Sequence, residues 1–182
     1  MVTIEVVFGV GWAAFWIYWI VAALATKRSL VPMRQFAGVR VVLVLVVLVV
    51  FRAGLFRGHG TSFSPLRAGI GLALFGAGLL VAIWARVHLG KNWGTPMSKS
   101  AEPELVTSGP YRLVRHPIYS GLLLALVGTA VALNWFWLIV AAAAGTYFIY
   151  SATVEERTMT EAFPEAYPAY VRSSKMLVPY VF

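Results

Sequence analysis

The sequence predicts an all-α integral membrane protein with about five transmembrane helices, a cytoplasmic loop and a C-terminal amphipathic segment that covers a site. Of its 182 residues, 60% are hydrophobic and 12% are charged, whereas soluble domains contain about 45–50% and about 25%. The net charge of +8 does not indicate a nucleic-acid partner, because the cations flank apolar runs, where they meet lipid headgroups. The chain has no cysteine, which excludes a disulfide framework and a thiolate metal site.

Five apolar runs have the length or the flanks of spanning helices, which need about 20 apolar residues. The second run has only 11 uninterrupted residues, but its flanking arginines can snorkel and apolar residues continue on both sides. Asn134 is the only polar residue between the last two runs, which predicts a tight helical hairpin. The predicted spans are 4–25, 41–51 (with apolar flanks over 36–56), 66–84, 118–133 and 135–152.

The loops orient these spans. Residues 26–40, residues 86–117 and the C-terminal tail hold 12 Lys and Arg, against 3 in residues 52–67. Cytoplasmic loops carry the excess of Lys and Arg. We therefore expect residues 26–40, residues 86–117 and the C-terminal tail to face the cytoplasm, at a bacterial or archaeal inner membrane. We divide the chain into residues 1–84, three membrane helices without an assigned chemical role, and residues 85–182, which continue the same membrane domain with a loop, a hairpin and a lid.

Glycines recur in the third and fourth spans. They lie inside apolar helices and follow no strand, so they do not form a phosphate-binding loop. Glycine lets helices approach closely in lipid, and we expect all of these residues to serve packing: Gly69, Gly71, Gly76, Gly78, Gly121 and Gly128.

Most polar side chains lie in two segments on the predicted cytoplasmic side, residues 86–119 and 155–170. Only the hairpin of the last two spans separates them, and a hairpin returns the chain to the side it left. We therefore expect His116 and Glu155 to lie close together. Because successive residues of a helix point about 100° apart, we expect at most one of Glu155 and Glu156 to face the bundle.

The residues alone leave two interpretations of these segments open. Pro117 suits the first turn of a helix, so its segment is either a simple helix start or, with Tyr119, part of a ligand pocket. Met159, Phe163, Tyr167 and Tyr170 recur at the spacing of one helix face, interrupted by Pro164 and Pro168; this tail is either a lid or an interfacial anchor. The histidines, His59, His88 and His116, lack the spacing of a metal site, so we expect no metal.

The order and spacing of three stretches are specific. They are Leu105-Val106-Thr107-Ser108-Gly109-Pro110-Tyr111 continuing to Arg115-His116-Pro117-Ile118-Tyr119; Glu155-Glu156 followed by Phe163, Glu165, Tyr167 and Tyr170; and His88-Leu89-Gly90-Lys91-Asn92-Trp93. Over residues 85–182 the chain resembles the isoprenylcysteine carboxyl methyltransferase family, whose pattern phospholipid methyltransferases share. The resemblance implies methyl transfer from S-adenosylmethionine to a lipophilic substrate, such as an isoprenylcysteine-type carboxylate, at the membrane interface. By position, it implies cofactor contacts at Leu105, Val106, Tyr111, His116, Pro117, Tyr119 and Glu155.

One position departs from this family. Ser151 stands where the isoprenylcysteine enzymes carry an arginine that is thought to hold the substrate carboxylate, and Arg157 follows the acidic pair instead. The methyl acceptor and the catalytic residue therefore stay unassigned. Arg115, Arg112 and Arg86 are possible substitutes for the arginine, and His116, His88 and Glu156 are possible bases for an amine acceptor; of these, Arg115, Glu156 and His88 are our catalytic candidates.

Three other functions remain open: a phospholipid amine N-methyltransferase, a nicotinamide-dependent sterol-type reductase and a non-catalytic membrane scaffold. Sterol reductases share an Arg-His-Pro segment and an ending like residues 178–182. The expected partners are a lipophilic small molecule and membrane lipids, with no nucleic acid. The oligomeric state is open.

Overall fold

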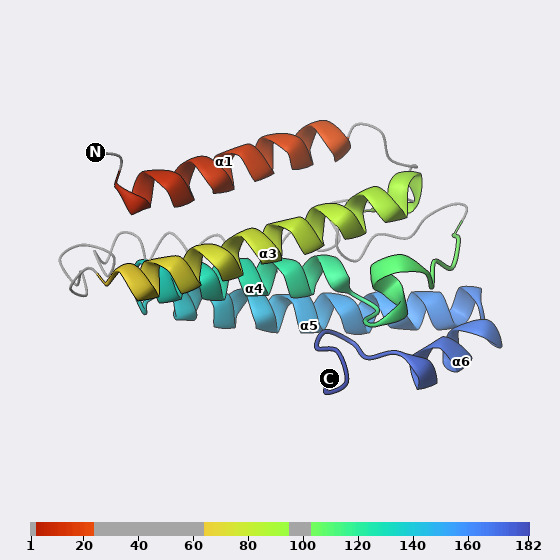
Figure 1. Ribbon diagram of the computed structural model, residues 1–182. Helices are drawn as coiled ribbons and strands as arrows, with labels where there is room; N and C mark the ends of the chain where they lie inside the picture. The colour runs from red at the N-terminus through yellow and green to blue at the C-terminus, as the bar shows by residue number, and fades with distance from the viewer. Residues whose placement is uncertain (1–2, 24–63, 95–102) are drawn as a thin grey trace.

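The computed structural model describes residues 3–23, 64–94 and 103–182, and within these ranges the chain is helical apart from turns and one isolated bridge (Figure 1). Helices α1, α3 and α5 are long and apolar enough to cross a membrane, and α4 is a shorter apolar helix. The protein is therefore an all-α membrane protein, as predicted; the span expected at 41–51 lies outside the described residues. The elements are α1 (Ile4–Ala23), α3 (Pro65–Leu89), η2 (Gly90–Asn92), η3 (Gly109–Arg112), α4 (Pro117–Ala132), α5 (Trp137–Ala162) and α6 (Ala166–Ser173).

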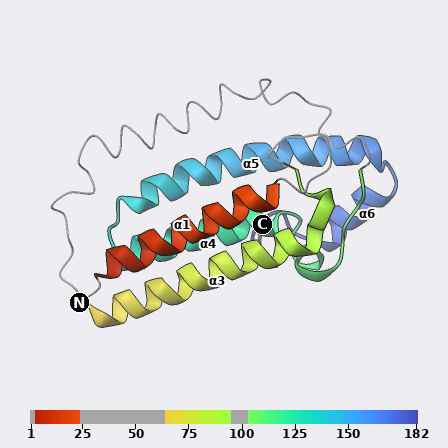
Figure 2. The ribbon, with the colours of Figure 1, turned by 90° about the horizontal axis from the view of Figure 1, so that it is seen from above.

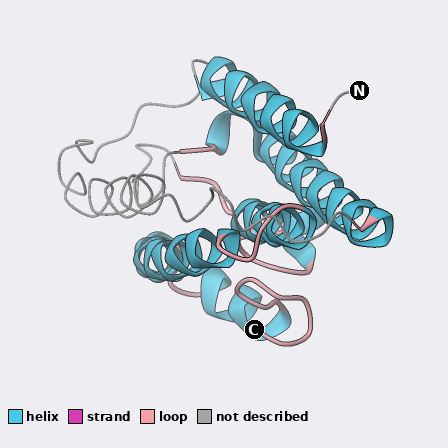
Figure 3. Ribbon diagram, turned by 90° about the vertical axis from the view of Figure 1, so that its left-hand side faces the viewer, coloured by secondary structure: helices cyan, strands magenta, loops and turns pink. Residues whose placement is uncertain are grey.

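The four long helices run side by side, with α4 between α3 and α5 (Figures 1 and 2). In the view from the end of the bundle, α1 lies beside α3 and stands away from α5 (Figure 3). The indole Nε1 of Trp12 donates to Thr129 Oγ1 at 3.3 Å and so links α1 to α4. Phe8 packs against Phe75 of α3 with ring centroids 4.6 Å apart.

Glycines bring α3 and α4 into backbone contact. A Cβ at Gly78 would lie 2.5 Å from the Ala125 amide nitrogen, and one at Gly128 would overlap the amide nitrogen of Phe75. Gly71 and Gly121 are equally crowded, so four of the glycines form the seam that we expected. Among the described residues, a Cβ at Gly69 or Gly76 would meet nothing within 4 Å, so these two glycines take no part in the seam with α4.

Two helices are longer than their predicted spans. Helix α3 continues to Leu89 because Arg86 is bonded within the protein: its Nη2 donates to the Ala22 carbonyl at 2.6 Å and its Nη1 to the Gly90 carbonyl at 2.8 Å. The guanidinium also lies over the ring of Trp93, 4.6 Å from its centroid. Helix α5 continues ten residues beyond position 152, and its acidic residues are likewise paired.

The hairpin between α4 and α5 and the tail after α5 place the polar segments together. Asn134 Oδ1 accepts a hydrogen bond from the Phe136 amide at 2.9 Å, which closes the predicted tight turn. After α5, the broken helix folds back, and the Arg115 amide donates to the Lys175 carbonyl at 2.8 Å. Pro164 lies in the break, whereas Pro168 lies in the first turn of α6, where proline is tolerated.

Candidate active site

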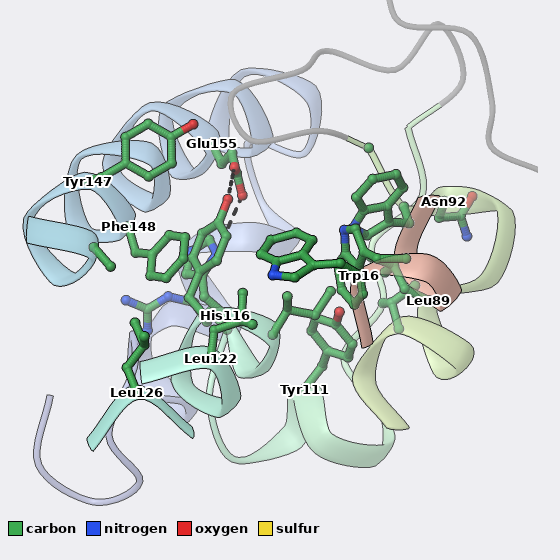
Figure 4. Close-up of a pocket in the computed structure, with 18 of the residues that line it drawn as sticks. Trp16, Leu89, Asn92, Tyr111, His116, Leu122, Leu126, Tyr147, Phe148 and Glu155 are labelled. Atoms are coloured by element: carbon green, nitrogen blue, oxygen red, sulfur yellow. Dashed lines mark hydrogen bonds and ion pairs between the residues drawn. The ribbon is translucent and has the colours of Figure 1, made fainter. Parts of the chain in front are cut away.

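A cavity of about 970 Å³ lies between α1, α4, α5 and the segments around residues 103–111 and 158–170. Ligand pockets span roughly 300–1,000 Å³, so this volume is at the upper end of that range. Figure 4 shows Tyr147, Phe148 and Glu155 on one side of the cavity and Trp16 and Leu89 on the other. Its walls are mostly aromatic and aliphatic, and Arg115, His116 and Glu155 form a polar group at one end.

The polar end is built around His116, the residue that precedes α4. Its Nδ1 lies 3.5 Å from Glu155 Oε2 and its Nε2 lies 3.2 Å from Glu156 Oε1. This confirms the predicted proximity of His116 and Glu155. The expectation that only one acidic residue would face the bundle is wrong, because the imidazole lies between the two carboxylates and contacts both. Only Glu155 of the pair lines the cavity.

The carboxylate of Glu155 is held by a stack of rings formed by His116, Tyr119 and Phe148. The Tyr119 hydroxyl donates to Glu155 Oε1 at 2.6 Å. The Tyr119 ring stacks between His116 and Phe148, with centroid distances of 5.5 Å and 4.6 Å and interplanar angles of 7° in both pairs. The carboxylate of Glu155 is therefore held by two donors on α4 and its N-cap while it faces the cavity.

Arg115 connects the polar end of the cavity to the C-terminal tail. Its Nε donates to Glu156 Oε1 at 2.7 Å and its Nη1 to the Ser174 carbonyl at 2.7 Å, and its side chain is only 8% exposed. The carboxylate of Glu156 thus contacts both Arg115 and His116. These contacts fix α5 and the tail relative to the start of α4.

The two carboxylates control the protonation of His116. Burial by itself would lower the pKa of His116, but the hydrogen bonds and negative charges of Glu155 and Glu156 outweigh burial and raise its pKa above the ordinary value. The imidazolium form donates from both ring nitrogens, which matches a carboxylate at each nitrogen. His116 is therefore suited to hold Glu155 in place as a donor.

The segment before α4 supplies the floor of the cavity. Tyr111 is buried, and its carbonyl accepts from the Tyr170 hydroxyl at 2.5 Å. Burial raises the pKa of Tyr170 to about 12, so its phenol keeps the proton that this bond needs. His88 Nε2 lies 2.9 Å from Ser108 Oγ, and the His88 ring fills the space beside Gly109, whose φ of +59° and close neighbours exclude a side chain.

The structure brings most of the predicted site residues to this cavity. Leu105, Val106, Tyr111, His116, Tyr119 and Glu155 all line it, together with Arg115. Pro117 is buried in the first turn of α4 and is not part of the lining. Glu156 and His88 also lie outside it, as do Arg86 and Arg112, the other two possible arginines.

Sequence reasoning missed the wall contributed by α1. Trp12, Trp16 and Trp19 line the cavity. Their spacing of four and three residues marks one face of a helix, so the pattern could have identified the shared face but not its place in the cavity wall. Tyr147 and Phe148 of α5 were also missed, and in an apolar span their sequence carries no comparable signal. Within residues 3–23, 64–94 and 103–182, no group of three or more His, Asp or Glu could hold a metal ion.

Known proteins resemble this chain in sequence. The sequence model of the family described as phospholipid methyltransferase matches residues 66–166. The chain is 30% identical over 149 residues to the cobalt-zinc-cadmium resistance protein CzcN of Cupriavidus metallidurans, covering 80% of this chain and 64% of that protein. It is 29% identical over 126 residues to a methanethiol S-methyltransferase of a Pseudomonas species, covering 64% of this chain and 48% of that protein.

A solved structure agrees in fold. The eukaryotic intramembrane Ras methyltransferase ICMT (isoprenylcysteine carboxyl methyltransferase) superposes with a TM-score of 0.57 over 84% of this chain and 55% of that one, at 21% identity. The chain thus spans between about half and two thirds of the length of these relatives. Because the family match covers more than half of the chain and includes α3, α4, α5 and the polar end of the cavity, the protein belongs to the phospholipid methyltransferase family of membrane methyltransferases.

Proposed function

We propose that this protein is an S-adenosylmethionine-dependent methyltransferase that acts on a lipophilic small molecule at the cytoplasmic interface of the membrane. One observation carries the proposal: Glu155, held by Tyr119 and His116, forms the polar end of a large apolar cavity. A pocket that combines apolar walls with a few convergent polar groups is the usual form of a small-molecule site.

The described residues fit the chemistry of this cofactor. The carboxylate of Glu155 can accept charge-assisted hydrogen bonds from ammonium or hydroxyl groups. The ring of Tyr111 lines the cavity and can contact a cation or adenine, whereas both faces of Tyr119 are stacked on His116 and Phe148. Leu105 and Val106 add apolar surface. When bound, the cofactor supplies an electrophilic methyl group on a cationic sulfur.

The chain's own residues would orient the reactants and exclude water. Holding two reactants in the right geometry lowers the barrier to their reaction, and the stack of His116, Tyr119 and Phe148 is a rigid support for such positioning. Met159, Tyr167 and Tyr170, from the end of α5 and from α6, close the cavity beside Glu155, which is the role of a lid. We assign Arg115, Glu156 and His88 as positioning residues, since their contacts hold the tail, α5 and the turn at residue 108.

A lipophilic acceptor fits the rest of the cavity. Its volume exceeds what one cofactor needs, and its far walls are formed by Trp12, Trp16, Leu122 and Leu126. The relatives' names specify a thiol, a carboxyl group on an isoprenylated cysteine and, for the family, a phospholipid. The acceptors in these names are apolar molecules or components of the membrane. They support a lipophilic class of substrate but do not single out one compound.

Calorimetric titration of detergent-purified protein with S-adenosylmethionine and with its demethylated product tests the proposal. We expect micromolar binding that Glu155→Gln and Tyr119→Phe each weaken, Glu155→Gln by about tenfold or more, or about 1.4 kcal/mol. Glu165→Gln is the matched control, because Glu165 is exposed and outside the cavity. It should bind like the wild type.

Two results would contradict the proposal. Folded wild-type protein that binds neither compound, with or without added lipid, would reject the cofactor. Binding of a nicotinamide cofactor in a parallel titration would favour the reductase, and binding of neither cofactor would favour a scaffold.

A further inference from the structure

We infer that Trp12 sets the length of the acceptor that this site takes: the acceptor carries one apolar chain, which runs along α1 and α4 from Glu155 to the indole. The inference rests on the proposed function and narrows its substrate class. It comes from the direction in which the cavity extends and from the contacts that fix the Trp12 ring.

The cavity extends along the helix axes. On α4 its lining residues run from Ile118 to Leu133, and on α1 they run from Glu5 to Trp19. At 1.5 Å per residue these stretches are about 22 Å and about 21 Å long. Within each stretch the lining residues recur mostly every three or four positions, which places them on one face of the helix. An elongated space between two helix faces fits an extended chain.

The polar and apolar parts of the cavity follow one another along α4. Tyr119, whose hydroxyl donates to Glu155 at 2.6 Å, lies in the first turn. Thr129 lies ten residues further on, or about 15 Å along the helix, and Leu122 and Leu126 line the wall between them. Since an extended chain of single bonds advances about 1.2 Å per bond, as an extended polypeptide backbone does, this stretch holds a chain of about 12 bonds.

Trp12 is fixed at the end of this stretch. Its Nε1 donates to Thr129 Oγ1 at 3.3 Å, and the Thr129 hydroxyl in turn donates to the Ala125 carbonyl at 2.8 Å. The rings of Phe15 and Phe75 meet the indole edge-on, with centroid distances of 6.0 Å and 5.4 Å and interplanar angles of 88° and 67°. The indole is therefore held by α1, α3 and α4 together.

The cavity continues past the indole, where Phe8, Leu133 and Trp137 line it. Trp12 therefore lies between two parts of one cavity. A chain longer than the first part must displace the indole and break its hydrogen bond, and a buried polar group left without its partner costs free energy. A smaller side chain at position 12 removes this barrier and joins the two parts.

Competition between two alcohols tests this length limit. An equimolar mixture of decanol and octadecanol is added to wild-type protein in detergent, and native mass spectrometry measures the ratio of the two bound alcohols. The decyl chain is shorter than the stretch from Tyr119 to Thr129 and the octadecyl chain is longer, whereas their head groups are the same. We expect the wild type to bind decanol at least tenfold more than octadecanol.

Two variants at position 12 should shift this ratio. Trp12→Ala should raise the share of octadecanol at least fivefold over the wild type, and this comparison cancels the different partition of the two alcohols into detergent. Trp12→Phe keeps a ring against Phe15 and Phe75 but cannot donate to Thr129, so it should raise the share less; it tests the same limit if Trp12→Ala does not fold. Trp84→Ala is the matched control, because Trp84 is 54% exposed on α3 and outside the lining. It should keep the wild-type ratio.

Three results would overturn the inference: equal binding of the two alcohols by the wild type, binding of neither alcohol, or a ratio that neither variant at position 12 changes relative to Trp84→Ala. The demethylated cofactor is titrated separately. Its binding in any of these cases would leave the proposed function standing. Its failure to bind while the length limit holds would reject the proposed function and keep the limit.

Discussion

The two faces of α4 show opposite ways of packing a helix in a membrane. On one face, Gly121, Ala125 and Gly128 bring its backbone against α3. On the other, Tyr119 and Leu122 point into a cavity of about 970 Å³. The comparison indicates that small residues build a closed seam, whereas larger residues surround a space that a ligand can fill.

The difference follows from the driving forces in lipid. Apolar side chains gain little by leaving lipid for another helix, so close backbone approach through small residues holds helices together. The α3–α4 seam therefore supplies rigidity. The opposite face can stay hollow because polar contacts, such as Trp12 to Thr129 and Arg115 to Glu156, hold α1 and α5 in place.

The largest effect should come from filling the seam. Gly78→Val would place a side chain against the backbone of Ala125 and Gly121, whose atoms cannot rotate away. Overpacking typically lowers the free energy of unfolding by about 1–3 kcal/mol, and we expect a loss at the upper end of this range. The Tm in detergent measures this loss, with Gly76→Val as the control, because a Cβ there meets no described residue within 4 Å. Equal losses in the two variants would contradict a closed seam.

A smaller effect is expected when the cavity wall is shortened. Leu126→Ala removes side-chain atoms beside a space that already exists. We therefore expect the free energy of unfolding to fall by less than the about 2–5 kcal/mol that truncating a leucine costs in a filled core. The variant should still bind S-adenosylmethionine like the wild type but should accept a longer or bulkier acceptor. Thermal unfolding and an acceptor series measure both. A loss as large as that of Gly78→Val would show that this face is packed rather than hollow.

The smallest effect concerns pH. The raised pKa of His116 in the folded protein means that its stabilising contribution is fully present below its unfolded pKa of about 6.5. That contribution is lost as the pH rises through the raised folded value. The Tm of the wild type should therefore fall more steeply between pH 6 and pH 9 than that of His116→Gln. Parallel curves would show that the two carboxylates do not stabilise the imidazolium.

The sequence predicted the part of the fold that local patterns encode. The predicted span 118–133 differs from α4 by one residue at each end, and the hairpin correctly placed His116 beside Glu155. The length of α5 was underestimated because hydropathy counts Glu155 and Glu156 as lipid-exposed charges, whereas partners distant in the sequence neutralise them. Gly69 and Gly76 show the same limit, since composition does not reveal which face of α3 meets α4.

The sequence predicted the polar residues of the site but missed apolar residues of its wall. His116, Tyr119 and Glu155 belong to a specific pattern, and all three line the cavity. Trp12, Trp16 and Trp19 belong to an apolar helix far away in the sequence. Their place in the wall depends on how α1 packs, which no local pattern determines.

The central claim is that Glu155, through its place at the end of the cavity, binds the cofactor. Glu155 and Glu156 are adjacent and both contact His116, but only Glu155 lines the cavity. The most direct measurement compares the affinity for S-adenosylmethionine of Glu155→Gln and Glu156→Gln. We predict a loss of tenfold or more for Glu155→Gln, and for Glu156→Gln a lower Tm with a loss of affinity below about threefold. Equal losses, or a larger loss for Glu156→Gln, would contradict the account.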